Sequence, residues 1–230
     1  MLTIAILNQK GGSGKSTLAE CLAVAAHLDG QASAVLDMDP QGTVYAWGKR
    51  REEPNPPVRS VTIANLRDEW EVLRDAGADI IIIDTPARLN DWAMQAAELA
   101  DLVIVPAKPT IKDLERVEAS IKLAQVSRAV PALVVLNQVR AQGDRADQAE
   151  ELIRSQTVPV CPTRLGFRVA FEDSDTLGLT PMETDPNGRA AEEIKMVYQY
   201  TIALLNKFTS ENVSHDPEKK EPRRRTVSAG

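Results

Sequence analysis

The 230-residue sequence has few cysteines, no long hydrophobic run and no excess of positive charge. Its two cysteines, Cys21 and Cys161, are far apart and have no neighbouring metal-ligand residues, so neither a disulfide framework nor a zinc site is indicated. The longest apolar runs, such as 80–83, have the length of a strand and fall short of the roughly 20 residues that a membrane-spanning helix needs. The formal net charge of -6 argues against a protein that coats nucleic acid through bulk charge, although it leaves room for a local basic face.

What remains is the composition of an ordinary soluble globular protein. Hydrophobic residues make up 43% of the chain and charged residues 26%, and the length suits one large domain or two small ones. Residues 1–8 lack the charged region, the long apolar stretch and the cleavage site of a signal peptide, and we expect them to form a strand. Together with the low cysteine content, this favours a reducing, cytosolic setting.

Short β-branched and aliphatic runs alternate with longer segments in which apolar residues recur every three to four positions. The short runs are continuously hydrophobic, which indicates strands covered on both faces, as in a parallel sheet flanked by helices. We therefore predict an α/β fold with a doubly wound, mostly parallel sheet. The predicted strands are 2–8, 33–37, 80–84, 102–106, 132–137 and 158–161, and the predicted helices are 15–29, 63–76, 90–99, 111–128, 145–155 and 189–208.

We expect one domain, residues 1–208, followed by a basic tail, residues 209–230. The charged, proline-rich stretch 49–57 is interpreted as a surface connection within the domain, because another strand-helix pattern follows it at once. The tail has no aromatic and almost no aliphatic residues, and its lysines and arginines cluster near prolines. Such a segment cannot bury enough apolar surface to fold, so we expect it to be disordered.

Segment 9–17 lies between the first predicted strand and the first predicted helix. Its glycines allow backbone N–H groups to turn inward around phosphate oxygens at a helix N-terminus. We expect Lys15 to reach the β- and γ-phosphates of a nucleotide, Ser16 to bind Mg²⁺ through its hydroxyl, and Thr17 to lie near the α-phosphate. The predicted nucleotide-binding residues here are Gly11, Gly12, Ser13, Gly14, Lys15, Ser16 and Thr17. A glycine-rich turn that serves folding alone is the alternative, but the flanking strand and helix favour a nucleotide site.

The segment departs from the general phosphate-loop pattern in two ways. The chain has Gln9 where that pattern has glycine, and it carries an additional lysine, Lys10. The run Lys-Gly-Gly-Ser-Gly-Lys-Ser at 10–16 resembles the deviant Walker A motif of the ParA/MinD family of P-loop ATPases, and the preceding Asn8-Gln9 is similar to its ParA branch. The resemblance covers about residues 1–206 and implies that Lys10 reaches across a nucleotide-sandwich dimer to the partner's ATP. There a cation would act on developing phosphoryl charge like an arginine finger, whereas the alternative for Lys10 is a solvated surface lysine.

Two acidic residues, Asp37 and Asp39, stand at the end of the second predicted strand, at the edge of the sheet where α/β ligand sites gather. Phosphoryl transfer to water needs a group that orients the attacking water, and one of these carboxylates can supply it. Segment 37–42 is similar to the first switch of the family, which implies that Asp39, directly before Pro40, positions the water. We assign Asp37 to a supporting position near Mg²⁺, while a turn or a helix cap is the alternative for this segment.

Asp84 ends an apolar strand in the form of a Walker B segment, and we expect its carboxylate to hold Mg²⁺ directly or through water. The segment resembles the second switch of the family, and a capping aspartate is the alternative. Asn137 closes a later strand and could hydrogen-bond the adenine edge, because an amide offers a donor and an acceptor. Segment 105–114 resembles the proline-containing dimer loop of the family, although its residues alone indicate only a rigid strand-to-helix turn.

Three arginines, Arg140, Arg164 and Arg168, are candidates for DNA-backbone contacts, which would be independent of sequence and sensitive to salt. Segment 163–171 is similar to a C-terminal part of ParA proteins that carries DNA-contacting basic residues, but scattered arginines are usually solvated surface. MinD-like proteins end in an amphipathic membrane-binding helix, and the tail of this chain has no apolar face. We therefore expect no stable membrane association.

These observations predict a ParA-type partition ATPase with ATP and Mg²⁺ as cofactors, which hydrolyses ATP slowly without an activator. The resemblance implies an ATP-dependent homodimer that binds DNA non-specifically, leaves it on hydrolysis, and segregates plasmid or chromosome copies with a ParB-like centromere-binding adaptor. Its expected place is the cytoplasm, on the nucleoid. Two alternatives stay open: a MinD-like or cargo-positioning ATPase that acts on a membrane or a protein cargo, and a nucleotide-dependent binding switch with negligible catalysis.

Overall fold

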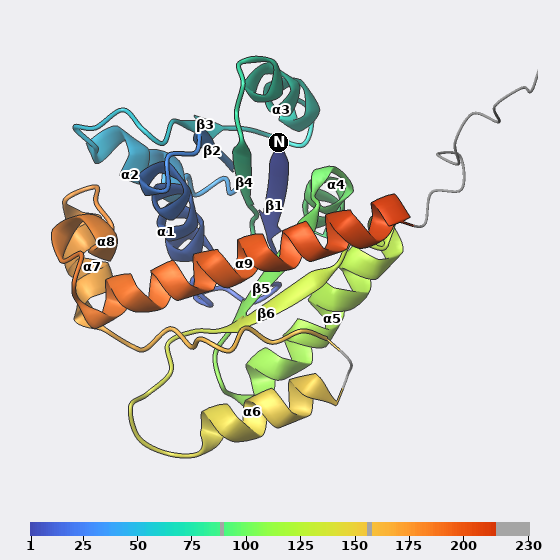
Figure 1. The fold of residues 1–230 in the computed structure, drawn as a ribbon, viewed down its shortest axis with the longest axis vertical. Coiled ribbons are helices and arrows are strands. Elements are labelled where there is room, and N and C mark those ends of the chain that lie inside the picture. The colour runs from blue at the N-terminus through green and yellow to red at the C-terminus, as the bar shows by residue number, and fades with distance from the viewer. Residues whose placement is uncertain (88–89, 156–157, 215–230) are drawn as a thin grey trace, which may run out of the picture.

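The computed structural model describes residues 1–87, 90–155 and 158–214, and these are built around one sheet (Figure 1). The strands are β1 (Leu2–Ile6), β2 (Ser33–Asp37), β3 (Val58–Ser60), β4 (Ile80–Asp84), β5 (Leu102–Ala107) and β6 (Ala132–Leu136). Every neighbouring pair is parallel, and the strand order is β3-β2-β4-β1-β5-β6. The chain starts near the middle of the sheet, winds to one edge and then to the other, so the predicted doubly wound α/β class is confirmed.

Helices cover both faces of this sheet. The helices are α1 (Lys15–Leu28), α2 (Thr43–Arg50), α3 (Leu66–Asp75), α4 (Asn90–Leu99), α5 (Ile111–Arg128), α6 (Arg145–Arg154), α7 (Val169–Thr176), α8 (Pro181–Thr184) and α9 (Arg189–Ser214). Buried side chains of α3, α4, α5 and α6 form one core layer against the sheet, and those of α1, α2 and α9 form the other. Within the described ranges, no helix is long and apolar enough to cross a membrane.

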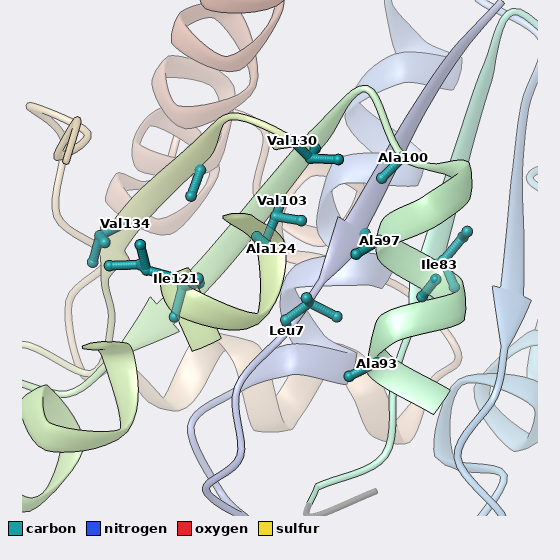
Figure 2. Packing of buried hydrophobic residues seen from close by; sticks show 14 of the residues in the cluster. Leu7, Ile83, Ala93, Ala97, Ala100, Val103, Ile121, Ala124, Val130 and Val134 are labelled. Atoms are coloured by element: carbon teal, nitrogen blue, oxygen red, sulfur yellow. The ribbon is translucent and has the colours of Figure 1, made fainter. Parts of the chain in front are cut away.

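Strand β4 shows why continuous hydrophobicity predicts this architecture. Successive side chains of a strand point to opposite faces, so Ile81 and Ile83 enter the first core layer while Ile80 and Ile82 enter the second. Full burial of such a side chain contributes about 1.5–3 kcal/mol, and all four are at most 3% exposed. Figure 2 shows the first layer, where α4 and α5 pack small side chains such as Ala97 against the sheet.

The predicted strand 158–161 is wrong. Only one isolated parallel bridge forms there, between Val160 and Val134 of β6. The Pro159 carbonyl accepts from the Val134 N–H over 2.9 Å, but Pro159 has no backbone N–H with which to extend the ladder towards Ala132. Beyond Pro162 the contact with β6 resumes at Leu165, whose N–H donates to the Leu136 carbonyl over 2.9 Å.

The end of the chain also differs from its prediction. Helix α9 continues to Ser214, six residues beyond the predicted end of the domain at 208, so the first part of the predicted tail is helical. The remainder of that tail, 215–230, lies outside the described residues. Helices α2, α7 and α8 were not predicted.

Candidate nucleotide-binding site

Three strands end at the same edge of the sheet and bring the predicted site residues together. The parallel register places Ile6 of β1 beside Asp84 of β4, and Asp84 beside Asp37 of β2. The loop between β1 and α1 therefore starts next to the carboxylates of Asp84 and Asp37, which end the neighbouring strands. This meeting point is where ligands bind in open α/β sheets.

Left-handed glycines shape that loop. Gly12 has φ 71° and Gly14 has φ 89°, a region that costs other residues roughly 1–2 kcal/mol. A Cβ on Gly14 would also lie 2.1 Å from the amide nitrogen of Asn137. Gly14 is the N-cap of α1 and supplies no side-chain cap, so the first N–H groups of the helix are available for an anion.

Lys15 is the cation at the start of α1, and it is only 7% exposed. Burial lowers the pKa of its ammonium, while the charges of Asp84 and Asp39 act in the opposite direction. A buried ammonium is costly unless it is paired, so this position favours an anionic ligand such as a phosphate.

Asp84 and Ser16 form the centre of the candidate metal site. The Ser16 hydroxyl donates to Asp84 Oδ2 over 2.7 Å, and the carboxylate is fully buried. Burial, with a smaller contribution from the charge of Asp37, raises the pKa of Asp84 to about 7, and the hydrogen bond from Ser16 opposes the rise. The other oxygen, Asp84 Oδ1, has no hydrogen-bond partner among the described residues, so it is free to accept a cation.

Asp37 is buried beside Asp84, and backbone groups hold its orientation. Its Oδ1 accepts a hydrogen bond from the Asp39 N–H over 2.9 Å, and its Oδ2 accepts one from the Tyr45 N–H over 2.8 Å. Burial raises the pKa of Asp37, and these two hydrogen bonds oppose the rise. The carboxylate therefore links the end of β2 to the start of α2.

Asp39 lies two residues farther along and is half-buried. Its Oδ1 accepts a hydrogen bond from the Gln41 N–H over 2.9 Å, which leaves the second oxygen for another donor. The described geometry does not place an attacking water, so the water-positioning role of Asp39 stays a prediction.

The donor set suits Mg²⁺ bound together with a nucleotide. Carboxylate and hydroxyl oxygens are the ligands this ion prefers, and it usually takes only one or two carboxylates because substrate phosphates supply other oxygens. Among the described residues there is no group of three or more His, Cys, Asp or Glu side chains that could hold a metal ion. Ser16, Asp37 and Asp84 fit such a shared site.

Asn137 braces the phosphate loop from the end of β6. Its amide nitrogen donates to the Ser13 carbonyl over 2.9 Å, and its amide oxygen accepts from the Gln138 N–H over 2.8 Å. The residue also lines a pocket beside Gly14 and Thr17. The predicted contact with adenine stays a prediction, but the bracing role was missed because it joins residues 124 positions apart.

Lys10 forms an ion pair with Asp113 in its own chain. Asp113 belongs to the first turn of α5, and the Thr110 hydroxyl donates to the same carboxylate oxygen, Oδ2. Asp113 was missed as a site residue. The Thr-x-x-Asp spacing at 110–113 is a capping pattern and predicts the helix start, but it carries no sign of the lysine.

The three arginine candidates lie in different surroundings. Arg140 is exposed. Arg164 binds Asp147 over 2.7 Å and Glu150 over 3.0 Å, and Arg168 pairs with Glu193. The carboxylates offset the charge that Arg164 and Arg168 would present to a phosphate backbone, and the role of all three in DNA binding stays a prediction.

Comparison with known proteins assigns the family. The model of the CobQ/CobB/MinD/ParA nucleotide binding domain matches residues 4–181. The chain belongs to this family. The matched range contains the phosphate loop, both strand-end carboxylates and Asn137, so the ParA/MinD membership that the sequence predicted is confirmed.

Relatives of this ParA/MinD domain match over most of their length. The chain is 26% identical over 214 residues to the maintenance of carboxysome distribution protein A of Halothiobacillus neapolitanus, covering 87% of this chain and 96% of that protein. It is 29% identical over 217 residues to the protein of the same name from Gloeobacter kilaueensis, covering 89% and 94%. It is 26% identical over 226 residues to the protein ParA of Rhizobium radiobacter, covering 91% and 98%.

Solved structures show the same fold. The MinC:MinD cell division protein complex of Aquifex aeolicus contains a chain that superposes with a TM-score of 0.72 at 16% identity, covering 88% of this chain and 96% of that one. MinD of Pyrococcus horikoshii, solved with Mg-ADP, superposes with a TM-score of 0.69 at 20% identity, with the same coverage of 88% and 96%.

Proposed function

We propose that this protein is an ATP-dependent positioning switch of the ParA type. It binds ATP with Mg²⁺, forms a homodimer around the nucleotide, binds DNA non-specifically in that state, and leaves the DNA when ATP is hydrolysed to ADP and phosphate. The observation that carries the proposal is the hydrogen bond from Ser16 to the buried Asp84, whose other carboxylate oxygen has no hydrogen-bond partner among the described residues. The buried Lys15 lies directly before Ser16, at the N-terminus of α1, which has no side-chain cap. In this proposal the protein acts in the cytoplasm, on the nucleoid.

Each part of the site has a task in phosphoryl transfer. The backbone of residues 11–14 and the ammonium of Lys15 hold the β- and γ-phosphates, which keeps the reacting phosphorus in place. Ser16, Asp84 and the neighbouring Asp37 would hold Mg²⁺, and the bound ion would neutralise charge on the phosphate oxygens. Asp39, half-buried at the same sheet edge, orients the water that attacks the γ-phosphate.

Lys10 completes the site in a dimer. In the proposed mechanism its ammonium reaches the nucleotide of the partner subunit and stabilises the charge that develops during hydrolysis, as an arginine finger does. Turnover of an isolated subunit is then slow, because one catalytic cation has to come from another chain.

The cargo is a separate part of the proposal. One candidate is a plasmid or chromosome copy, recruited by a ParB-like centromere-binding adaptor, and the relative named ParA supports it. A second candidate is a protein body, and it is favoured by the two relatives named for the maintenance of carboxysome distribution, each of which matches over more than nine-tenths of its length. Both need the same ATP cycle and differ in the adaptor.

Co-sedimentation tests the proposal. The purified protein is spun with non-specific duplex DNA and, separately, with anionic liposomes, each with ATP·Mg²⁺, ADP·Mg²⁺ or no nucleotide and at two salt concentrations. We expect DNA binding only with ATP, weakened by salt. ATP-driven liposome binding would instead support the MinD-like alternative. DNA binding that is the same with ATP, with ADP and without nucleotide would refute the proposed function.

Substitution of Asp39 tests the catalytic part. Asp39→Ala should keep ATP and remain on DNA while ATP turnover falls by a factor of about 100 or more, because a positioned acid or base group contributes roughly 10²–10⁴-fold. Glu52→Ala, which removes an exposed carboxylate beyond α2, is the matched control and should change neither property. Normal turnover in Asp39→Ala would remove this residue from the mechanism, and ATP that survives unhydrolysed in the wild-type complex would favour the switch with negligible catalysis.

A further inference from the structure

Both the side chain and the backbone of Lys10 are bound within its own subunit. Its ammonium pairs with Asp113, and only 35% of the side chain remains exposed. Its backbone N–H donates to Asn8 Oδ1 over 2.8 Å, and the Asn8 amide nitrogen donates to the Pro106 carbonyl over 2.7 Å. The start of the phosphate loop is thus fastened to the end of β5, directly before the helix that carries Asp113.

Asp113 occupies a position that needs a cation. Its carboxylate is fully buried, and Oδ1 has no hydrogen-bond partner within the described ranges of the chain. The other oxygen, Oδ2, accepts from both Thr110 and Lys10. A buried carboxylate is costly unless it is paired, so the ammonium of Lys10 stabilises this charge.

The place of Asp113 in α5 allows Lys10 to leave. Asp113 is the third residue of the helix, and its backbone N–H bonds to the Thr110 carbonyl over 2.9 Å. The N-terminal turn of a helix stabilises a negative charge, because its unpaired N–H groups carry partial positive charge. The helix and Thr110 therefore keep part of the stabilisation when the ammonium moves away, and the ion pair can open without disrupting the fold.

One ammonium cannot rest in this buried pair and bind the phosphates of another subunit at the same time. We propose that Asp113 is a positioning residue that retains Lys10 in its own subunit, in competition with the nucleotide phosphates of the partner. Opening of the pair is then a step of ATP-dependent dimerisation and raises the protein concentration at which the dimer forms. This inference rests on the proposed function, because it takes the reach of Lys10 across the dimer from it.

The ion pair is tested first without nucleotide, in the full chain. Acetylation of the Lys10 amine by a water-soluble reagent is measured by mass spectrometry in the wild type, Asp113→Asn and Glu115→Gln. Asparagine keeps the shape of Asp113 and an oxygen that can accept from Thr110, but it removes the charge that pairs with Lys10. Glu115→Gln removes an exposed carboxylate two residues farther along α5. We expect several-fold more acetylation of Lys10 in Asp113→Asn and no change in Glu115→Gln. Equal acetylation in all three proteins overturns the proposal.

The competition is tested by sedimentation with a non-hydrolysable ATP analogue and Mg²⁺. Asp113→Asn should dimerise at about one-tenth of the protein concentration that the wild type needs, a coupling of typical size between two binding events. In a Lys10→Ala background the same substitution should make no difference, a result that a merely structural role of Asp113 would not give. Asp113→Ser, which also removes the carboxylate, provides a second variant, and circular dichroism and nucleotide affinity confirm that each protein is folded.

The outcomes separate the two proposals. If Lys10 becomes more reactive in Asp113→Asn but dimerisation is unchanged or weaker, the competition is refuted while the proposed function stands. If the wild type binds the analogue and stays monomeric at every concentration, both the proposed dimer and the competition are refuted. This holds even if the acetylation experiment confirms the ion pair between Lys10 and Asp113.

Discussion

Replacing Gly14 by alanine tests how the phosphate loop is held in shape. The φ of 89° costs an alanine roughly 1–2 kcal/mol. The new Cβ would lie 2.1 Å from the amide nitrogen of Asn137, so that side chain has to move and give up its hydrogen bond to the Ser13 carbonyl, at a further cost of about 1–3 kcal/mol. The free energy of unfolding should therefore fall by about 2–5 kcal/mol, a large part of the stability of a typical domain.

Two other glycines of the loop separate these costs. Gly12 has φ 71° but no atom within 4 Å of a Cβ, so Gly12→Ala carries the backbone cost alone. Gly11 has neither a left-handed φ nor a close neighbour, and Gly11→Ala should be nearly neutral. Urea denaturation followed by circular dichroism measures the series, with Gly14→Ala expected to be the least stable and Gly11→Ala the most stable.

A double variant decides whether the contact with Asn137 matters. In Gly14→Ala combined with Asn137→Ala the obstructing amide is gone, so the loss of stability should be smaller than the sum of the two single losses. Additive losses, or a Gly14→Ala protein as stable as Gly12→Ala, would refute the steric part of the reasoning.

Two further predictions follow from charges. Burial raises the pKa of Asp84 from its ordinary value of 3.8 to about 7, so the stability that its protonated form contributes is complete below pH 4 and is lost as the pH rises towards 7. Urea denaturation of the nucleotide-free protein should show that Asp84→Asn removes roughly 4 kcal/mol of this fall, while a parallel pH dependence in both proteins would contradict the argument. For DNA, Arg140→Ala should weaken ATP-dependent binding and lower the salt slope by about 1, whereas Arg164→Ala should change little, because Asp147 and Glu150 already neutralise its charge. Equal effects of the two substitutions in a salt titration would argue against that assignment.

Much of the fold was predictable because its signals are local. The isoleucine run of β4, the glycines before α1 and the apolar spacing of α5 each depend on neighbours within one element, and α4 and α5 have the predicted bounds. Helix α8 could have been predicted as well, since Thr180 and Glu183 form a complete capping box. Helix α2 has only eight residues between Gly42 and a proline-rich stretch, too few for a clear helical period.

The predictions that failed concern segments whose contacts are with residues distant in sequence. Arg51 lies in a stretch expected at the surface, yet its side chain is 2% exposed, stacked over Trp47 and paired with Glu183, 132 positions away. The predicted strand 158–161 has suitable residue types, but it forms only one bridge with β6, and Pro159 has no N–H to donate to that strand.

The sequence by itself determined the fold class and the chemistry of the site: a phosphate loop, Lys15, and acidic residues at the ends of buried strands. These depend on backbone conformation and hydrophobic periodicity, which a short segment carries within itself. Only the tertiary structure decided which groups meet, as when Asn137 reaches Ser13 and Lys10 reaches Asp113 across 103 positions. Such pairs depend on the order of strands in the sheet and on burial, because a charge or an amide removed from water binds whichever partner the fold places beside it.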